Sequence, residues 1–177
     1  MYKNYPNRKL NRLKGYDYSQ DGYYFMTTCI KDRIEYFGEI KDGIMFLNEY
    51  GKIVKQCWLD LIKHYWNCRL DEFIIMPNHV HGIVEINNNC EGTDLKSVRT
   101  LINKKYSLST IIQGFKVFSS RKINKQNPVI IFRWQRSFYD HIIRNEKSLY
   151  QIREYIQNNP LRWELDRNNP ENFLYDN

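Results

Sequence analysis

Residues 73–86 read FIIMPNHVHGIVEI, which is two apolar runs separated by Pro77 and Asn78. The first run, Phe73–Met76, is short and continuous, as is typical of a strand buried on both faces. The second run, His79–Ile86, has the composition of a further strand. Because Pro77 and Asn78 interrupt the pattern, we predict that a hairpin links the two strands.

Strand-like and helix-like segments lie on both sides of this hairpin. Tyr23–Ile30 is rich in aromatic and β-branched residues and is predicted to form the first strand. Leu47–Tyr65 and Leu108–Phe118 carry apolar residues at the spacing of amphipathic helices. Ile130–Ile143 contains strand-like stretches around positions 133–135, and a last helix is predicted from position 146 to about 158.

The predicted order is strand, helix, strand, strand, helix, strand, helix. This order favours an α+β fold, a ferredoxin-like (RRM-like) sandwich in which helices pack on one face of an antiparallel sheet and a further helix ends the domain. We expect a single domain over 1–177, with a basic N-terminal arm at 1–22 and a polar, mobile insertion at 87–105. An RRM-type binding module has the same order, so the order alone does not separate an enzyme from a binder.

The composition favours a nucleic-acid partner. Lys and Arg outnumber Asp and Glu by 27 to 20, the net charge is +7, and aromatic residues make up 15% of the chain. Basic side chains release counterions from a polyanion, and aromatic rings stack on unpaired bases. The four cysteines lack zinc-finger spacing, and neither a signal peptide nor a membrane-spanning apolar run is evident. We therefore expect a cytoplasmic, nucleoid-associated protein without a membrane partner.

Two histidines of the second hairpin strand are the first candidate site. Side chains alternate along a strand, so His79 and His81 share one face while Val80 points to the other. Two adjacent imidazoles can hold one cation. The alternative is a strand that carries two surface histidines without a ligand.

The last helix, which Asn145 is placed to cap, carries the second candidate site. Tyr155 and Asn159 are four residues apart and lie one above the other, beside an apolar stripe. A phenol and a carboxamide in this arrangement can both reach the same position beside the helix. The alternative is a tyrosine at the rim of the core and an asparagine that caps the helix before Pro160.

Together the two segments resemble the single-tyrosine HUH transposases, and within them the REP-associated tyrosine transposases. The histidine signature corresponds to Ile75–Gly82, and the catalytic helix to His141–Asn145, Arg153–Ile156 and Asn159–Leu161. The similarity continues in Gly15–Ser19 and Trp134–Tyr139, so it covers nearly the whole chain in family order.

The resemblance implies an enzyme that cleaves and rejoins hairpin-associated single-stranded DNA through a covalent 5′-phosphotyrosine. Tyr155 would be the nucleophile, with Tyr139 and Tyr150 in other roles. His79, His81 and Asn159 would bind the divalent metal, Mg²⁺ or Mn²⁺; insertion-sequence relatives often have Gln in place of Asn159. Both a homodimer and a monomer are compatible with the family. Candidate DNA-binding residues are the basic side chains Arg8, Arg12, Lys14, Lys96, Arg99, Lys104, Lys105, Lys116, Arg121 and Lys122.

Two alternatives remain open from the sequence. One is a non-catalytic RRM-like nucleic-acid-binding module in which the two histidines are incidental. The other is a zinc-dependent hydrolase that uses His79, His81 and a cysteine. A covalent adduct with DNA would distinguish the transposase from both, because neither a binder nor a hydrolase forms one.

Overall fold

The computed structural model describes residues 12–89, 105–127, 129 and 131–175. A four-stranded antiparallel sheet with the strand order β4-β5-β1-β6 forms its centre, and a two-stranded sheet pairs β2 with β3. The elements in chain order are β1 (Gly22–Cys29), η1 (Lys31–Arg33), β2 (Gly38–Lys41), β3 (Ile44–Leu47), α1 (Glu49–Leu59), α2 (Leu61–His64), β4 (Cys68–Ile75), β5 (His79–Ile86), α4 (Leu108–Gln126), β6 (Tyr139–Ile143), α5 (Glu146–Gln157), η2 (Pro160–Leu165) and η3 (Pro170–Tyr175).

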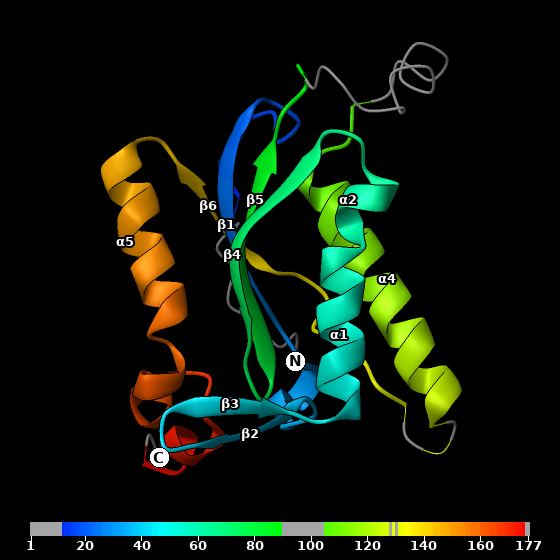
Figure 1. Cartoon of the computed structure of the whole chain (residues 1–177), viewed down its shortest axis with the longest axis vertical. Helices are drawn as coiled ribbons and strands as arrows, with labels where there is room; N and C mark the ends of the chain where they lie inside the picture. Colours follow the sequence, from blue (N-terminus) through cyan, green and yellow to red (C-terminus); the bar gives the residue numbers. More distant parts are fainter. Residues whose placement is uncertain (1–11, 90–104, 128, 130, 176–177) are drawn as a thin grey trace, which may run out of the picture.

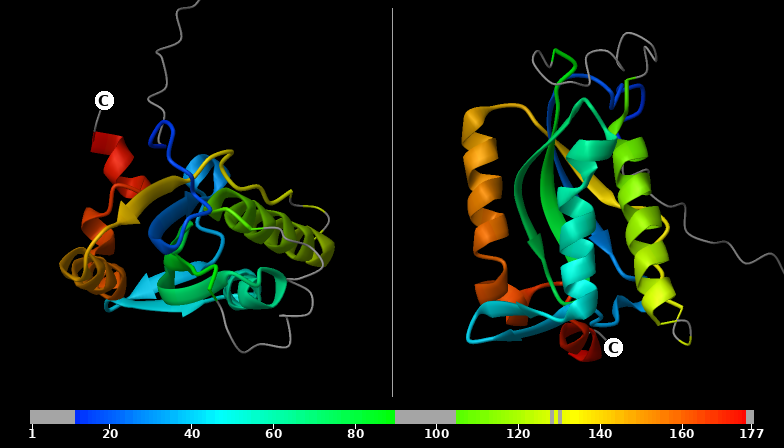
Figure 2. Two further views of the ribbon diagram at one scale, coloured as in Figure 1. Left: turned by 90° about the horizontal axis from the view of Figure 1, so that it is seen from above. Right: turned by 45° about the vertical axis from the view of Figure 1, so that its right-hand side comes forward.

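The central sheet separates two apolar cores. On one face, side chains from α1 and α4 pack against Val80, Val84 and Ile86 of β5. On the other face, α5 packs through Leu149 and Ile156 against a smaller cluster. Figures 1 and 2 show α1 and α4 on one side of the sheet and α5 on the other. The α+β class is confirmed, while the ferredoxin-like assignment stays a prediction.

The hairpin predicted from residues 73–86 is present as β4 and β5. The core-facing residues of β5 alternate with His79 and His81, which therefore face α5. The predicted N-cap Asn145 is also confirmed, since its side chain accepts a hydrogen bond from the Ser148 amide. Ser107 caps α4, since its side chain accepts a hydrogen bond from Thr110 N–H.

Several element boundaries differ from the sequence-based expectation. The helix expected over 47–65 is divided into α1 and α2 at Asp60, and α4 continues beyond Phe118 to Gln126. The last strand begins at Tyr139, whereas Trp134 forms only an isolated bridge with Ile30. The β2–β3 hairpin was not predicted. The predicted insertion at 87–105 lies largely outside the described residues.

Gly82 sets how closely α1 approaches β5. A methyl group at this position would lie 2.4 Å from Cζ2 of Trp58, a ring that is fully buried. We therefore expect Gly82→Ala to lower the free energy of unfolding by about 1–3 kcal/mol, as overpacking of a core does. Urea denaturation measures the loss. In a Trp58→Leu background, which lacks the clashing ring, Gly82→Ala should lower the free energy of unfolding by less than it does in wild type. Strictly additive losses would contradict the steric explanation.

Candidate active site

The two histidines of β5 are buried on the face that α5 covers. His79 is 0% exposed and His81 is 2% exposed, so the alternative of two surface histidines is wrong. Their Nε2 atoms lie 2.9 Å apart. Two nitrogens that occupy neighbouring positions on one octahedral ion, each at about 2.1 Å, are about 3 Å apart. The pair therefore has the spacing that one divalent cation requires.

Asn78 determines which nitrogen of His79 carries the proton. Its amide group donates to the carbonyls of Arg33 and Asn168 at 3.0 and 2.8 Å, which uses both amide hydrogens. Its Oδ1 is 2.8 Å from Nδ1 of His79 and can only accept there. Nδ1 consequently carries the hydrogen, and Nε2 of His79 presents a lone pair toward His81. This is the tautomer that a metal ligand needs.

His81 is oriented in a similar way from the neighbouring strand. Its Nδ1 lies 2.7 Å from the hydroxyl of Thr27 on β1, and its ring stacks on Phe25. Burial, followed by the positive charge of Arg167, lowers the pKa of His81 to about 3. Burial also lowers the pKa of His79 well below its usual value, with further contributions from His81 and Arg167. Both imidazoles are therefore neutral at pH 7 and able to donate lone pairs.

Tyr155 on α5 reaches this pair from the opposite side. Its hydroxyl lies 3.4 Å from Nε2 of His81, and its ring packs edge-to-face on Phe25. Burial, followed by the negative charge of Asp166, raises the pKa of the Tyr155 phenol, and the Asn159 side chain opposes the rise. The side chain is nevertheless 40% exposed, so a substrate can approach the hydroxyl.

Asn159, one turn beyond Tyr155, is only 2% exposed. Its side chain caps no helix, since Asn158 ends α5 and no side-chain hydrogen bond begins η2. Its Oδ1 is buried and accepts no hydrogen bond within the described part of the chain. A buried oxygen without a donor is costly unless another group satisfies it. The residue therefore fits a metal ligand better than the predicted alternative of a helix cap.

A bulge in β4 fixes α5 against the sheet. The register between β4 and β5 shifts between Leu70 and Phe73, so the side chains of Asp71 and Glu72 both face α5. Arg153 donates two hydrogen bonds to the Asp71 carboxylate, and Gln157 donates to Glu72. The bond from Arg153 holds the pKa of the Asp71 carboxyl below its usual range. These contacts lie on either side of Tyr155 along the helix and position it.

Asp166 is a residue of the site that the sequence did not indicate. Ligand atoms of His79, His81 and Asp166 all lie within 4.8 Å of one another. A lone aspartate after a helix carries no motif, and only the fold of η2 brings it back to β5. Trp163, in η2, stacks on His79 with ring centroids 6.0 Å apart.

The other tyrosines considered as nucleophiles lie apart from the histidine pair. Tyr150 is 62% exposed and donates to Glu154 on the outer side of α5. Tyr139 packs its ring edge-to-face on Phe25. Among these three tyrosines, Tyr155 is the one whose hydroxyl contacts His81.

The predicted DNA-binding residues are dispersed. Arg8, Lys96, Arg99 and Lys104 lie outside the described residues. Lys14, Lys105, Arg121 and Lys122 are exposed, the last two on α4, which covers the face opposite the histidines. Lys116 donates to the carbonyls of Gln135 and Ser137, and burial lowers its pKa to about 8. The structure thus gives Lys116 an internal role.

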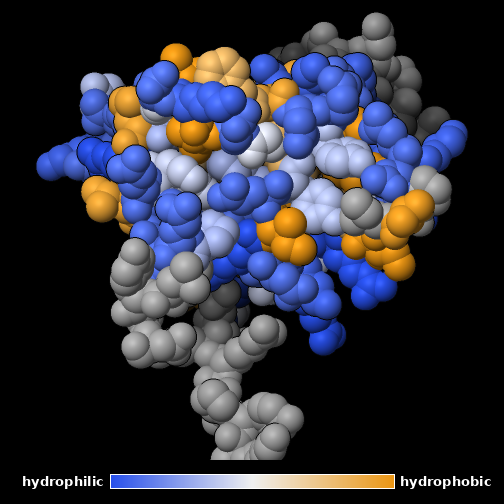
Figure 3. Space-filling view, turned by 90° about the horizontal axis from the view of Figure 1, so that it is seen from below, coloured by the Kyte–Doolittle hydropathy of each residue, from blue (hydrophilic) through white to orange (hydrophobic). Residues whose placement is uncertain are grey.

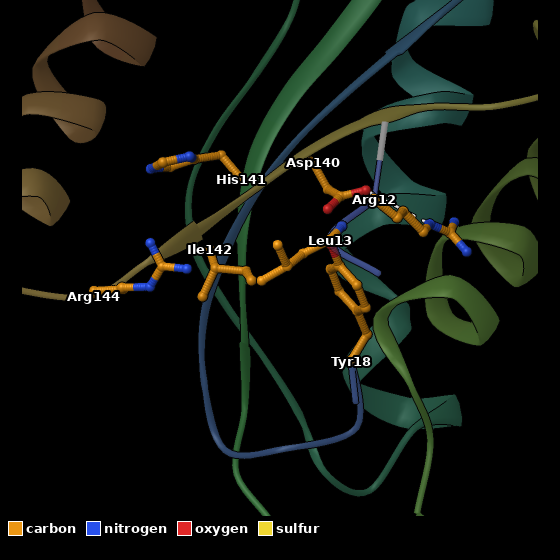
Figure 4. Close-up of a pocket in the computed structure, with 7 residues that line it drawn as sticks. All are labelled: Arg12, Leu13, Tyr18, Asp140, His141, Ile142 and Arg144. Atoms are coloured by element: carbon orange, nitrogen blue, oxygen red, sulfur yellow. Dashed lines mark hydrogen bonds and ion pairs between the residues drawn. The ribbon is translucent and has the colours of Figure 1, made fainter. Parts of the chain in front are cut away.

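Arg12 lies in a groove along the outer edge of β6. Figure 4 shows the groove, which is lined by Arg12, Leu13, Tyr18, Asp140, His141, Ile142 and Arg144. Nε of Arg12 is 3.6 Å from the buried Asp140 carboxylate. This groove is distinct from the histidine pair.

A second, polar groove adjoins the histidines. Its lining includes Thr27, which contacts His81, together with Arg33 and Arg167, and it also contains Cys29, Gln135, Ser137, Phe138, Tyr139 and Asn168.

The end view in Figure 3 shows a mainly hydrophilic surface with separate hydrophobic patches. Among the described residues, no helix combines the length and apolar character that crossing a membrane requires.

Known proteins resemble this chain in sequence. Residues 98–159, which include Tyr155 and Asn159, match the family described as “Transposase IS200 like”. In this segment the chain resembles the IS200-like transposases. A putative REP-associated tyrosine transposase of Haemophilus influenzae is 25% identical over 146 residues, covering 82% of this chain and 74% of that protein. An uncharacterized protein of the same organism is 42% identical over 167 residues, covering 91% and 92%.

Solved transposase structures share the fold. A REP-associated tyrosine transposase bound to a REP hairpin superposes with a TM-score of 0.58 at 18% identity, covering 85% of this chain and 73% of that chain. A putative transposase from Deinococcus radiodurans gives 0.50 at 17% identity, covering 83% and 95%. The predicted resemblance to REP-associated tyrosine transposases is thereby confirmed. The similarity to transposases supports an enzyme that acts on DNA.

Proposed function

We propose that this chain is an IS200-like transposase, a metal-dependent single-stranded DNA endonuclease and strand transferase that cleaves and rejoins hairpin-associated DNA through a 5′-phosphotyrosine at Tyr155. The observation that carries the proposal is the 3.4 Å contact between the Tyr155 hydroxyl and Nε2 of His81. This contact brings the Tyr155 hydroxyl of α5 beside a buried, neutral histidine pair of β5, which supports a nucleophilic role for Tyr155.

The residues present fit a divalent cation. His79 and His81 offer neutral nitrogens 2.9 Å apart, and Asn159 offers a buried amide oxygen without a donor. We assign these side chains as ligands of Mg²⁺ or Mn²⁺, which accept imidazole and amide oxygen together. When bound there, the ion would polarise the scissile phosphate and stabilise the charge that develops on its oxygens.

Tyr155 performs the bond exchange. Its oxygen attacks phosphorus, forming the phosphotyrosine bond while the bond to the 3′ oxygen breaks and leaves a free 3′-OH. The phenol proton leaves toward solvent on the exposed side of the ring, and the 3′ oxygen takes up a proton. The reverse attack by a 3′-OH reseals the strand without an external energy source, because the phosphotyrosine linkage retains the free energy of the phosphodiester bond that was broken.

The polar groove beside the histidines is suited to the DNA strand. Arg33 and Arg167 line it, and Thr27 joins it to His81. Guanidinium groups bind phosphate through charge-assisted hydrogen bonds. The structural relative bound to a REP hairpin supports hairpin DNA as the substrate.

The direct test is incubation with hairpin-bearing single strands and Mn²⁺, followed by denaturing gels and peptide mapping. The proposal requires a covalent adduct on the peptide that contains Tyr155. A non-catalytic RRM-like module would bind without an adduct. The hydrolase alternative would yield cleaved DNA that is not attached to the protein.

The N-terminal arm gives a prediction about binding. Removing residues 1–11 leaves Arg12 in contact with Asp140 but deletes three basic side chains, Lys3, Arg8 and Lys9. Affinity for single-stranded DNA should then fall less steeply with salt, because fewer counterions are released. Titrations at several salt concentrations measure the slope for cognate and scrambled hairpins. If the arm reads the bases flanking the hairpin, the cognate strand loses more affinity than the scrambled one; equal losses would limit the arm to a charge effect.

A further inference from the structure

The carboxylate of Asp166 lies beside the histidine pair on the side of the C-terminal segment. Its Oδ2 is 3.9 Å from Nε2 of His79, and its side chain is only 6% exposed. Among the described residues, His79 is the basic group within ion-pair distance of Asp166. A buried carboxylate is normally paired with a cation or coordinated to a metal.

Hydrogen bonds hold Asp166 in one position. Its Oδ1 accepts from Asn168 N–H at 2.6 Å, and its amide donates to Trp163 at 3.0 Å. Its carbonyl accepts from Asn169 N–H at 3.0 Å and from Nδ2 of Asn172 at 2.8 Å. The turn therefore uses Oδ1 and leaves Oδ2 facing His79.

Asn78 connects this turn to the metal-binding strand. The same side chain that accepts from Nδ1 of His79 donates to the carbonyl of Asn168, two residues after Asp166. Asn78 is fully buried. The position of the Asp166 turn and the orientation of His79 are thus fixed by one group, which is how ligands of a common ion are kept together.

We propose that Asp166 is a further ligand of the divalent ion assigned to His79, His81 and Asn159, an inference that rests on the proposed function. The other three side chains are uncharged, so Asp166 alone supplies negative charge to the ion. A carboxylate oxygen is also the ligand that Mg²⁺ and Mn²⁺ prefer. The site then combines two imidazoles, one amide and one carboxylate.

Asp166→Asn isolates the charge from the structural role. The amide oxygen still accepts from Asn168 N–H, so the turn is kept while the negative charge is lost. Isothermal titration of the full chain with Mn²⁺, without DNA, should show affinity about 10–100-fold weaker than wild type. The thermal midpoint of the metal-free protein should stay unchanged. Asp166→Ser, whose hydroxyl can also accept from Asn168, provides a second variant if the amide disturbs folding.

Glu164→Gln is the matched control, because it removes one negative charge from the same segment at an exposed position. It should bind Mn²⁺ as wild type does, whereas His79→Ala should bind none. Wild-type affinity in Asp166→Asn and Asp166→Ser, or an equal loss in Glu164→Gln, overturns the assignment of Asp166 and leaves the proposed function intact. If wild type itself binds no Mn²⁺, the metal site fails as a whole, together with the metal dependence of the proposed function.

Discussion

Tyr155→Phe should bind hairpin DNA with wild-type affinity and form no covalent adduct. The substitution keeps the ring and its packing on Phe25 but removes the oxygen that we propose attacks phosphorus. Loss of a nucleophile lowers the rate by at least about a thousandfold, whereas an ordinary tyrosine hydroxyl contributes about 1 kcal/mol through one hydrogen bond. Denaturing gels for the adduct and equilibrium titration for DNA binding separate the two quantities.

Tyr150→Phe is the matched control for this experiment. It keeps the ring and loses an exposed hydroxyl on the outer side of α5. This variant should form the adduct at close to the wild-type rate. An adduct in Tyr155→Phe, or its loss in Tyr150→Phe, would assign the nucleophile to a different tyrosine.

His79→Ala should abolish cleavage while leaving DNA affinity within a few-fold of wild type. Removing the imidazole deletes a proposed metal ligand, but contacts to the DNA backbone are expected to carry most of the binding. The same loss should appear when excess EDTA is added to wild type and should be reversed by Mn²⁺. Cleavage assays and DNA titrations in parallel test both parts.

His64→Ala controls for the loss of a histidine as such. His64 is exposed on α2, on the far side of the sheet from the site. The His64→Ala variant should cleave DNA as wild type does. Because His79→Ala also leaves Asn78 without its hydrogen-bond donor, its thermal midpoint needs to be compared with wild type. Normal cleavage by a well-folded His79→Ala, or in excess EDTA, would refute the metal assignment.

Periodicity was sufficient to predict the sheet and most helices. Alternation along His79–Ile86 placed both histidines on one face, and the apolar stripe of α5 placed Tyr155 beside it, because these patterns depend only on neighbours in sequence. The β2–β3 hairpin carries no such clear pattern, since its burial alternates only between exposed and intermediate. The sequence therefore predicted the elements with a buried face.

The residues that the sequence did not reveal act through distant contacts. Asp166 reaches His79 only after η2 turns the chain back, and Asn78 acquires its role from carbonyls of Arg33 and Asn168. The bulge that turns Asp71 and Glu72 toward α5 is likewise a property of strand pairing. No local pattern encodes such contacts, so a structure was needed to find them.

The hydrogen bond from Asn78 to Asn168 joins residues that are 90 positions apart, and the contact of Tyr155 with His81 spans 74. Contacts of such separation form late, because long loops must close first. A chain still emerging from the ribosome therefore presents the histidine strand well before Tyr155 and the turn at Asn168. The proposed site would be incomplete in any chain that is truncated before these residues.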